Sequence, residues 1–89
     1  MKCIITVLGK DQVGIIARIS TYLAEVNVNI LDISQTIIAG YFNMIMIVDV
    51  SDIKKPLETI TEDLSKIGGQ LGVVANIQHE DIFNCMHRI

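Results

Sequence analysis

A polar turn between an apolar segment and an amphipathic one holds the residues best suited to chemistry. The turn, Gly9 to Gln12, leads into a helix that Gly14 opens. Backbone N–H groups at a helix start attract a carboxylate, because the helix dipole is positive there. Asp11 could accept hydrogen bonds from an ammonium group, and Asn29, just beyond the helix, offers both a donor and an acceptor. The turn therefore suits a small zwitterionic ligand.

Each of these residues also has an ordinary structural interpretation. Gly14 could serve only a sharp strand-to-helix turn, and Asp11 could be a plain turn or capping residue. Asn27 suits the left-handed position that ends a helix, whereas Asn29 could simply hold the entry to the next strand. Asp32, on an expected edge strand, is ordinarily a solvated charge that discourages aggregation, although it could face a dimer mate.

Hydrophobic periodicity predicts four strands and two or three helices. A step of two marks the strands, and steps of three and four mark the helices. In the first helix these steps predict one apolar stripe, formed by Ile15, Ile19, Tyr22, Leu23 and Val26. Pro56 is tolerated only in a first turn, so the second helix is expected to start a few residues before it, with Ser51-Asp52 as a capping candidate. In chain order, the expected segments are strand Lys2–Leu8, helix Val13–Val26, strand Val28–Ala39, a Gly40-Tyr41 hairpin, a strand to about Val50, a helix ended by Gly68-Gly69, strand Leu71–His79 and a short helix within Glu80–Ile89.

This order, βαββαβ plus a C-terminal helix, predicts an α+β fold of the ferredoxin-like type. Right-handed crossovers then give a four-stranded antiparallel sheet, with both helices on one face. The first and third strands are apolar on both faces and the other two alternate with polar residues, which predicts the spatial order 4-1-3-2. The sheet face away from the helices needs a cover, from the terminal helix, a second subunit or both. We expect a single domain over 1–89, with a core at 1–79 and a helical tail at 80–89.

Composition excludes several function classes. The net charge is −3 and the Lys and Arg residues are scattered, which argues against nucleic-acid binding. The longest uncharged stretch, Ile33 to Val48, is broken by polar residues and does not form a membrane span. No signal-peptide pattern opens the chain, so a cytoplasmic location is expected, with Cys3 and Cys85 as reduced thiols.

Metal and catalytic chemistry are both weakly indicated. His79, Cys85 and His87 match no standard zinc spacing, so we predict no metal and no cofactor. The first turn has no CxxC pair for a metallochaperone, and the first and third strands lack the mid-strand aromatics of an RNA-recognition domain. Gly14 and Arg18 have a spacing that could suit an acylphosphatase-like phosphate cradle. Asp11 opposes that remote alternative, because its carboxylate would repel the substrate.

The ordered combination of these features resembles the ACT-domain family of small-molecule-sensing modules, over residues 1 to 80. It is carried by the Gly9-x-Asp11-x-x-Gly14 entry, Leu23-Ala24-Glu25 at the helix end and Asn29-Ile30 opening the next strand. The following Asp32-Ile33-Ser34-Gln35 is similar to free-standing bacterial ACT proteins and to the ACT repeats of the glycine-cleavage repressor type. Many relatives have Pro where this chain has Val13. The resemblance implies a ligand site, between the turn of one subunit and the second strand of its neighbour, formed by Asp11, Gln12, Val13, Gly14, Ile15, Asn29 and Ile30.

The resulting hypothesis is a non-catalytic regulatory domain. It would be a homodimer that binds a small molecule, most simply an amino acid, and acts through a partner protein. The alternative is an ACT-fold interaction module that oligomerises without a ligand. The sequence identifies neither the ligand nor the partner.

Overall fold

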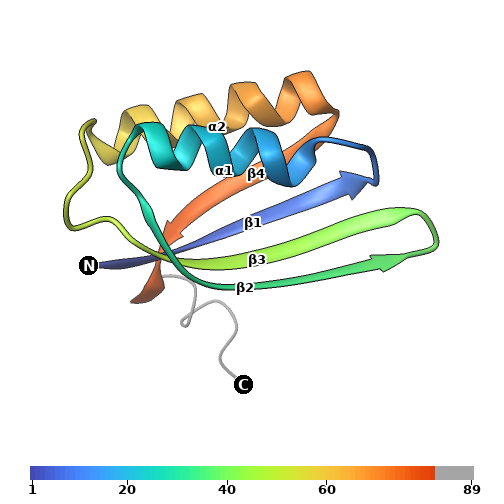
Figure 1. The fold of residues 1–89 in the computed structure, drawn as a ribbon, viewed down its shortest axis with the longest axis horizontal. Coiled ribbons are helices and arrows are strands. Elements are labelled where there is room, and N and C mark those ends of the chain that lie inside the picture. Colours follow the sequence, from blue (N-terminus) through green and yellow to red (C-terminus); the bar gives the residue numbers. More distant parts are fainter. Residues whose placement is uncertain (82–89) are drawn as a thin grey trace.

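The structure is a computed structural model, and it describes residues 1–81; the expectations for the tail at 82–89 lie outside the described residues. A four-stranded sheet carries two helices on one face (Figure 1). The elements in chain order are β1 (Lys2–Lys10), α1 (Ile15–Glu25), β2 (Asn29–Ile38), β3 (Tyr41–Asp49), α2 (Leu57–Leu71) and β4 (Val73–His79).

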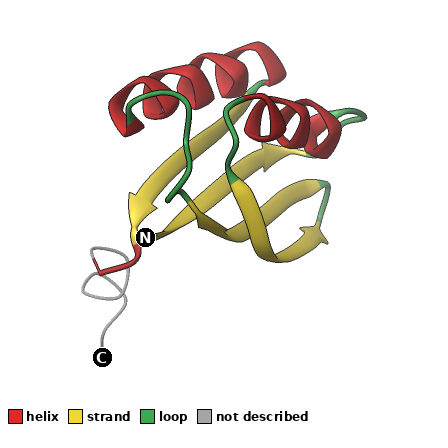
Figure 2. Ribbon diagram, turned by 60° about the vertical axis from the view of Figure 1, so that its left-hand side comes forward, coloured by secondary structure: helices red, strands yellow, loops and turns green. Residues whose placement is uncertain are grey.

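The strand order is β2-β3-β1-β4, and every neighbouring pair is antiparallel. This is the predicted order 4-1-3-2, read from the other edge. Both helices lie on the same side of the sheet, and neither of them covers the other side (Figure 2). The predicted ferredoxin-like architecture is confirmed, because strands that are apolar on both faces do occupy the centre.

The core lies between the sheet and the two helices. Alternate residues of β1, β3 and β4 point toward the helices, and each helix contributes one apolar stripe. The predicted stripe of α1 is confirmed, with Tyr22 only partly buried at its edge. The least exposed large side chains are Ile5, Val7, Ile15, Ile19, Leu23, Met44, Met46, Val48, Ile60 and Leu64.

The second helix differs from the prediction at both ends. Ser51 and Asp52 lie in a turn upstream of it, and Pro56 is the N-cap residue, with ψ at 147°. At the other end the helix runs through Gly68 and stops at Gly72, which takes φ 74°. A Cβ atom at Gly68 would lie 2.7 Å from the Val73 carbonyl oxygen. The glycine therefore serves the close packing of α2 on β4, not helix termination.

The hairpin and the first strand also differ in their bounds. Ala39 and Gly40 form the turn, with φ 52° and 82°, and Tyr41 already pairs with Ile38. Positive φ at both turn residues matches the right-handed twist of the flanking strands. The first strand extends beyond Leu8 to Lys10, because Lys10 pairs with Tyr41. The polar turn is thus shorter than the sequence suggested.

Candidate ligand-binding site

The turn that links β1 to α1 is exposed and anchored at one point. Asp11 donates its backbone N–H to the Gly40 carbonyl oxygen at 2.9 Å, which fixes the turn against the β2–β3 hairpin. Gln12, Val13 and Gly14 are all exposed, and Val13 is the most exposed large apolar side chain in the described residues. The turn is therefore open to solvent.

Gly14 gives the start of α1 its shape. Its φ of 98° lies in the left-handed region, where L side chains are strained. No described side chain caps this helix start, and the first turn contains no acidic residue. The positive end of the helix dipole is therefore not compensated locally, which favours an anionic group there.

Ile15 can contribute only main-chain atoms to such a site. Its side chain is 2% exposed and belongs to the core. Its backbone N–H is still among the first donors of α1, which a helix leaves without an intrahelical partner. The predicted role of this residue is therefore limited to its amide.

Asn29 and Ile30 lie at the other end of α1. The two ends of this 11-residue helix are about 16 Å apart at 1.5 Å per residue. Asn29 is exposed and pairs with Asp49, whereas Ile30 is half-buried against the core. Within one chain, the turn and the start of β2 are not brought together. The lining of a polar cleft of about 440 Å³ includes Asn29 and consists of Ala24, Asn27, Val28, Asn29, Asp49 and Asp52.

Strand β2 is an open edge. It pairs with β3 on one side only, and none of its residues is buried. Ile33 and Ile37 lie on the helix side of the sheet, opposite Met46 and Phe42, yet they are 44% and 57% exposed. These two side chains, here called the apolar shelf, form an exposed apolar surface of the kind that a partner usually buries.

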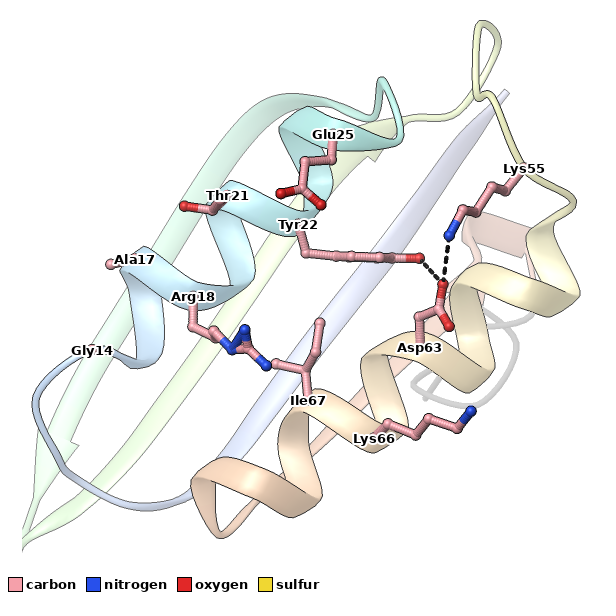
Figure 3. Close-up of a pocket in the computed structure, with 10 residues that line it drawn as sticks. All are labelled: Gly14, Ala17, Arg18, Thr21, Tyr22, Glu25, Lys55, Asp63, Lys66 and Ile67. Atoms are coloured by element: carbon pink, nitrogen blue, oxygen red, sulfur yellow. Dashed lines mark hydrogen bonds and ion pairs between the residues drawn. The ribbon is translucent and has the colours of Figure 1, made fainter.

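A groove between α1 and α2 was not foreseen from the sequence (Figure 3). It has a volume of about 650 Å³, and Tyr22 reaches across it so that its hydroxyl donates to Asp63 Oδ2 at 2.6 Å. Lys55 Nζ lies 3.4 Å from the same oxygen. The apolar stripe placed Tyr22 near the core, and a phenol in that position needs a hydrogen-bond partner, which was the available signal.

The groove shifts the acidities of its two linked groups. Burial, then the hydrogen bond to Asp63, raises the pKa of Tyr22. The same hydrogen bond is the main cause that lowers the pKa of Asp63, with help from Lys55. The raised pKa favours the neutral phenol of Tyr22, and the lowered pKa favours the charged carboxylate of Asp63. The pair is a structural link between the two helices.

Arg18 points away from the turn. Its guanidinium donates to Gln70 Oε1 across the groove, and it extends toward α2 in Figure 3. A phosphate cradle would need this group to turn back toward the amides that follow Gly14. The observed side chain does not adopt that arrangement.

Within residues 1–81, no three His, Cys, Asp or Glu side chains come together as metal ligands, while Cys85 and His87 lie outside the described residues. His79 Nδ1 lies 3.6 Å from Asp81. Cys3 is a free, buried thiol whose pKa is raised by burial. In the described part of the chain, no helix is long and apolar enough to cross a membrane.

Comparison with known proteins identifies the family. A profile of the ACT domain matches residues 2–78, from the start of β1 almost to the end of β4. This chain belongs to the ACT-domain family. The ACT domain is a regulatory fold that binds small ligands, and its members often dimerise. A UPF0237 protein of Bifidobacterium longum is 56% identical to this ACT domain over 88 residues, covering 99% of this chain and 98% of the relative.

Solved structures agree with the family assignment. An ACT domain protein from Streptococcus pneumoniae has a TM-score of 0.81 and 44% identity, with 93% of each chain covered. A structure described as a glycine cleavage system transcriptional repressor has a TM-score of 0.72 at 19% identity, covering 86% of this ACT domain and 44% of that chain. The second likeness concerns the fold alone. The family profile and the Streptococcus pneumoniae structure confirm the resemblance drawn from the polar turn and the strand entry.

Proposed function

We propose that this ACT domain binds an amino acid between two copies of the chain and has no catalytic activity of its own. The observation that carries the proposal is the uncapped, exposed start of α1 at Gly14. Its free amides suit a carboxylate, and the exposed carboxylate of Asp11, three residues before Gly14, suits an ammonium group. An amino acid carries both groups on one carbon atom.

A second copy would complete this site. The start of α1 and Asn29 are at opposite ends of a helix, so one ligand can meet both only if they come from different chains. The open edge of β2, with the exposed Ile33 and Ile37, supports self-association, since exposed strand edges and apolar patches favour pairing. Ligand binding would then be read out by a partner protein in the cytoplasm, with residues 1–89 acting as one domain.

The alternative is oligomerisation without a ligand. The same open strand edge favours it, because that edge needs no small molecule to become buried. The two functions differ in their response to metabolites. A thermal-shift screen against the proteinogenic amino acids separates them, since a ligand at 100 times its Kd adds about 2.7 kcal/mol. A dimer whose melting temperature no amino acid raises would favour the alternative.

Asp11 is the residue that tests the site. Its side chain is exposed, so Asp11→Asn removes one charge without disturbing the core. We expect calorimetry to show binding of the amino acid found in the screen weakened by about 1.5–3 kcal/mol, as for a lost charged hydrogen bond. Glu62→Gln is the matched control, because Glu62 is also exposed but lies on α2 and lines neither the groove nor the cleft that contains Asn29. Equal affinities of the two variants would place the site elsewhere. Gly14 is unsuitable for this purpose, because any side chain at φ 98° strains the turn itself.

A further inference from the structure

The sheet face away from the helices, here called the open face, is buried at one end only. Leu8 and Val74 are 52% and 61% exposed, and Ile45 is 43% exposed. Ile4, in contrast, is 7% exposed, although it does not belong to the core cluster beneath the helices. Its neighbour Ile47 is half-buried. Burial on this face is therefore concentrated around the pair formed by Ile4 and Ile47.

The described chain ends beside that pair. Ile4 pairs with Gln78 of β4 as well as with Ile47 of β3, so the three lie in one row across the sheet. Beyond His79, residues 80–81 leave the strand on the side opposite the helices, as both ribbon views show (Figures 1 and 2). The segment that follows thus starts at the edge of the open face.

The sequence of 82–89 matches this face in pattern and in length. Its apolar residues recur at spacings of one, three and three, which places them on one side of a helix. A helix of this length spans about 12 Å, and the centres of β4 and β3 are about 10 Å apart across β1. The apolar side would consist of Ile82, Phe83, Met86 and Ile89, and the polar side of Asn84, Cys85, His87 and Arg88.

Charged residues indicate in which orientation the segment would lie on the open face. Asp32 is exposed on β2 and pairs with Ile47, so it extends the same row to the far edge of the sheet. Arg88 lies near the end of the segment, where a helix laid along the row would arrive. Attraction between the Arg88 guanidinium and the Asp32 carboxylate favours this orientation over the reverse one.

We propose that residues 82–89 dock as an amphipathic helix on the open face of their own chain. Phe83 packs over Ile4 and Ile47, and Arg88 points toward Asp32. The segment then removes the apolar end of this face from water and leaves the β2 edge as the surface for a second copy. This proposal does not depend on ligand binding.

Contacts between one phenylalanine ring and two isoleucine methyl groups test the proposal directly. The chain has two phenylalanines, and Phe42 is buried on the helix side of the sheet. In the full-length protein with labelled Phe rings and Ile methyl groups, we expect nuclear Overhauser effects from Phe83 to Ile4 and Ile47. Their absence in the folded protein would overturn the proposal.

Two controls separate the possible occupants. Phe83→Ala should move the methyl resonances of Ile4 and Ile47, whereas Asn84→Ala, on the polar side of the segment, should leave them in place. Circular dichroism confirms that both variants fold. A sample that mixes Phe-labelled with Ile-labelled chains detects contacts between copies. Cross-peaks from Phe83 to Ile4 and Ile47 in this mixed sample would show that a second copy covers the face, which overturns docking within one chain.

Discussion

The Tyr22 hydroxyl lies 2.6 Å from Asp63 Oδ2 and joins the C-terminal half of α1 to the middle of α2 across their groove. A second hydrogen bond joins the helices, because the Arg18 guanidinium donates to Gln70 Oε1 across the same groove. Together with Lys55 Nζ, which lies 3.4 Å from Asp63 Oδ2, these side-chain contacts hold the two helices side by side.

Removing the Tyr22 hydroxyl should change the titration of Asp63. Its pKa is lowered in the folded protein, chiefly by Tyr22, so its contribution to stability is present above its unfolded pKa of about 3.9 and is lost as the pH falls further. Tyr22→Phe should raise the Asp63 pKa toward its ordinary value and flatten the acid limb of the stability curve. Carboxyl NMR titration measures the first effect and urea melts the second. An Asp63 pKa that does not move in the variant contradicts the link.

Neighbouring glycines in α2 should respond oppositely to alanine. At Gly68 a Cβ atom would lie 2.7 Å from the Val73 carbonyl oxygen, so Gly68→Ala should cost about 1–3 kcal/mol through overpacking. At Gly69 nothing lies within 4 Å, so Gly69→Ala should add about 0.5–1 kcal/mol, because alanine is the better helix former. Chemical denaturation measures both. Equal effects of the two changes would show that α2 does not pack as closely on β4 as described.

Leu23 should be among the most costly positions to truncate. It is 0% exposed at the centre of the α1 stripe, so Leu23→Ala should lower the free energy of unfolding by about 2–5 kcal/mol. Thr21→Ala, on the exposed side of the same helix, is the matched control and should change it by less than about 0.5 kcal/mol. Urea melts at a fixed protein concentration make the comparison. Similar losses in the two variants would mean that the helix phase is wrong.

Self-association should depend on the apolar shelf of β2. We expect sedimentation equilibrium at micromolar concentration to give at least a dimer of the 9.9 kDa chain. Ile37→Lys places a charge on the helix side of the edge strand and should shift the mass toward that of the monomer. Thr36→Lys puts the same charge on the opposite side of the strand and should have a smaller effect. If the wild-type protein sediments as a monomer, the proposed ligand site between two copies is excluded as well.

Sequence alone determined the order of the elements and the central position of β1 and β3. Both follow from local pattern, because a strand covered on two faces must be apolar at every position, and an amphipathic helix shows its stripe regardless of its partners. It also located the turn at Asp11 and Gly14 and the left-handed Asn27, which takes φ 63°. The resemblance to the ACT-domain family rests largely on these same residues, so the sequence was sufficient to indicate it.

Tertiary contact decided what local pattern could not. Gly68 and Gly69 look like a helix end in the sequence, but the helix continues because Gly68 is needed for the close approach of β4. The bond between Tyr22 and Asp63 joins residues that are 41 positions apart, and no periodicity can predict it. The hydrogen bond from the Asp11 backbone N–H to the Gly40 carbonyl oxygen is likewise a property of the assembled fold, because sequence order alone does not say which turns meet.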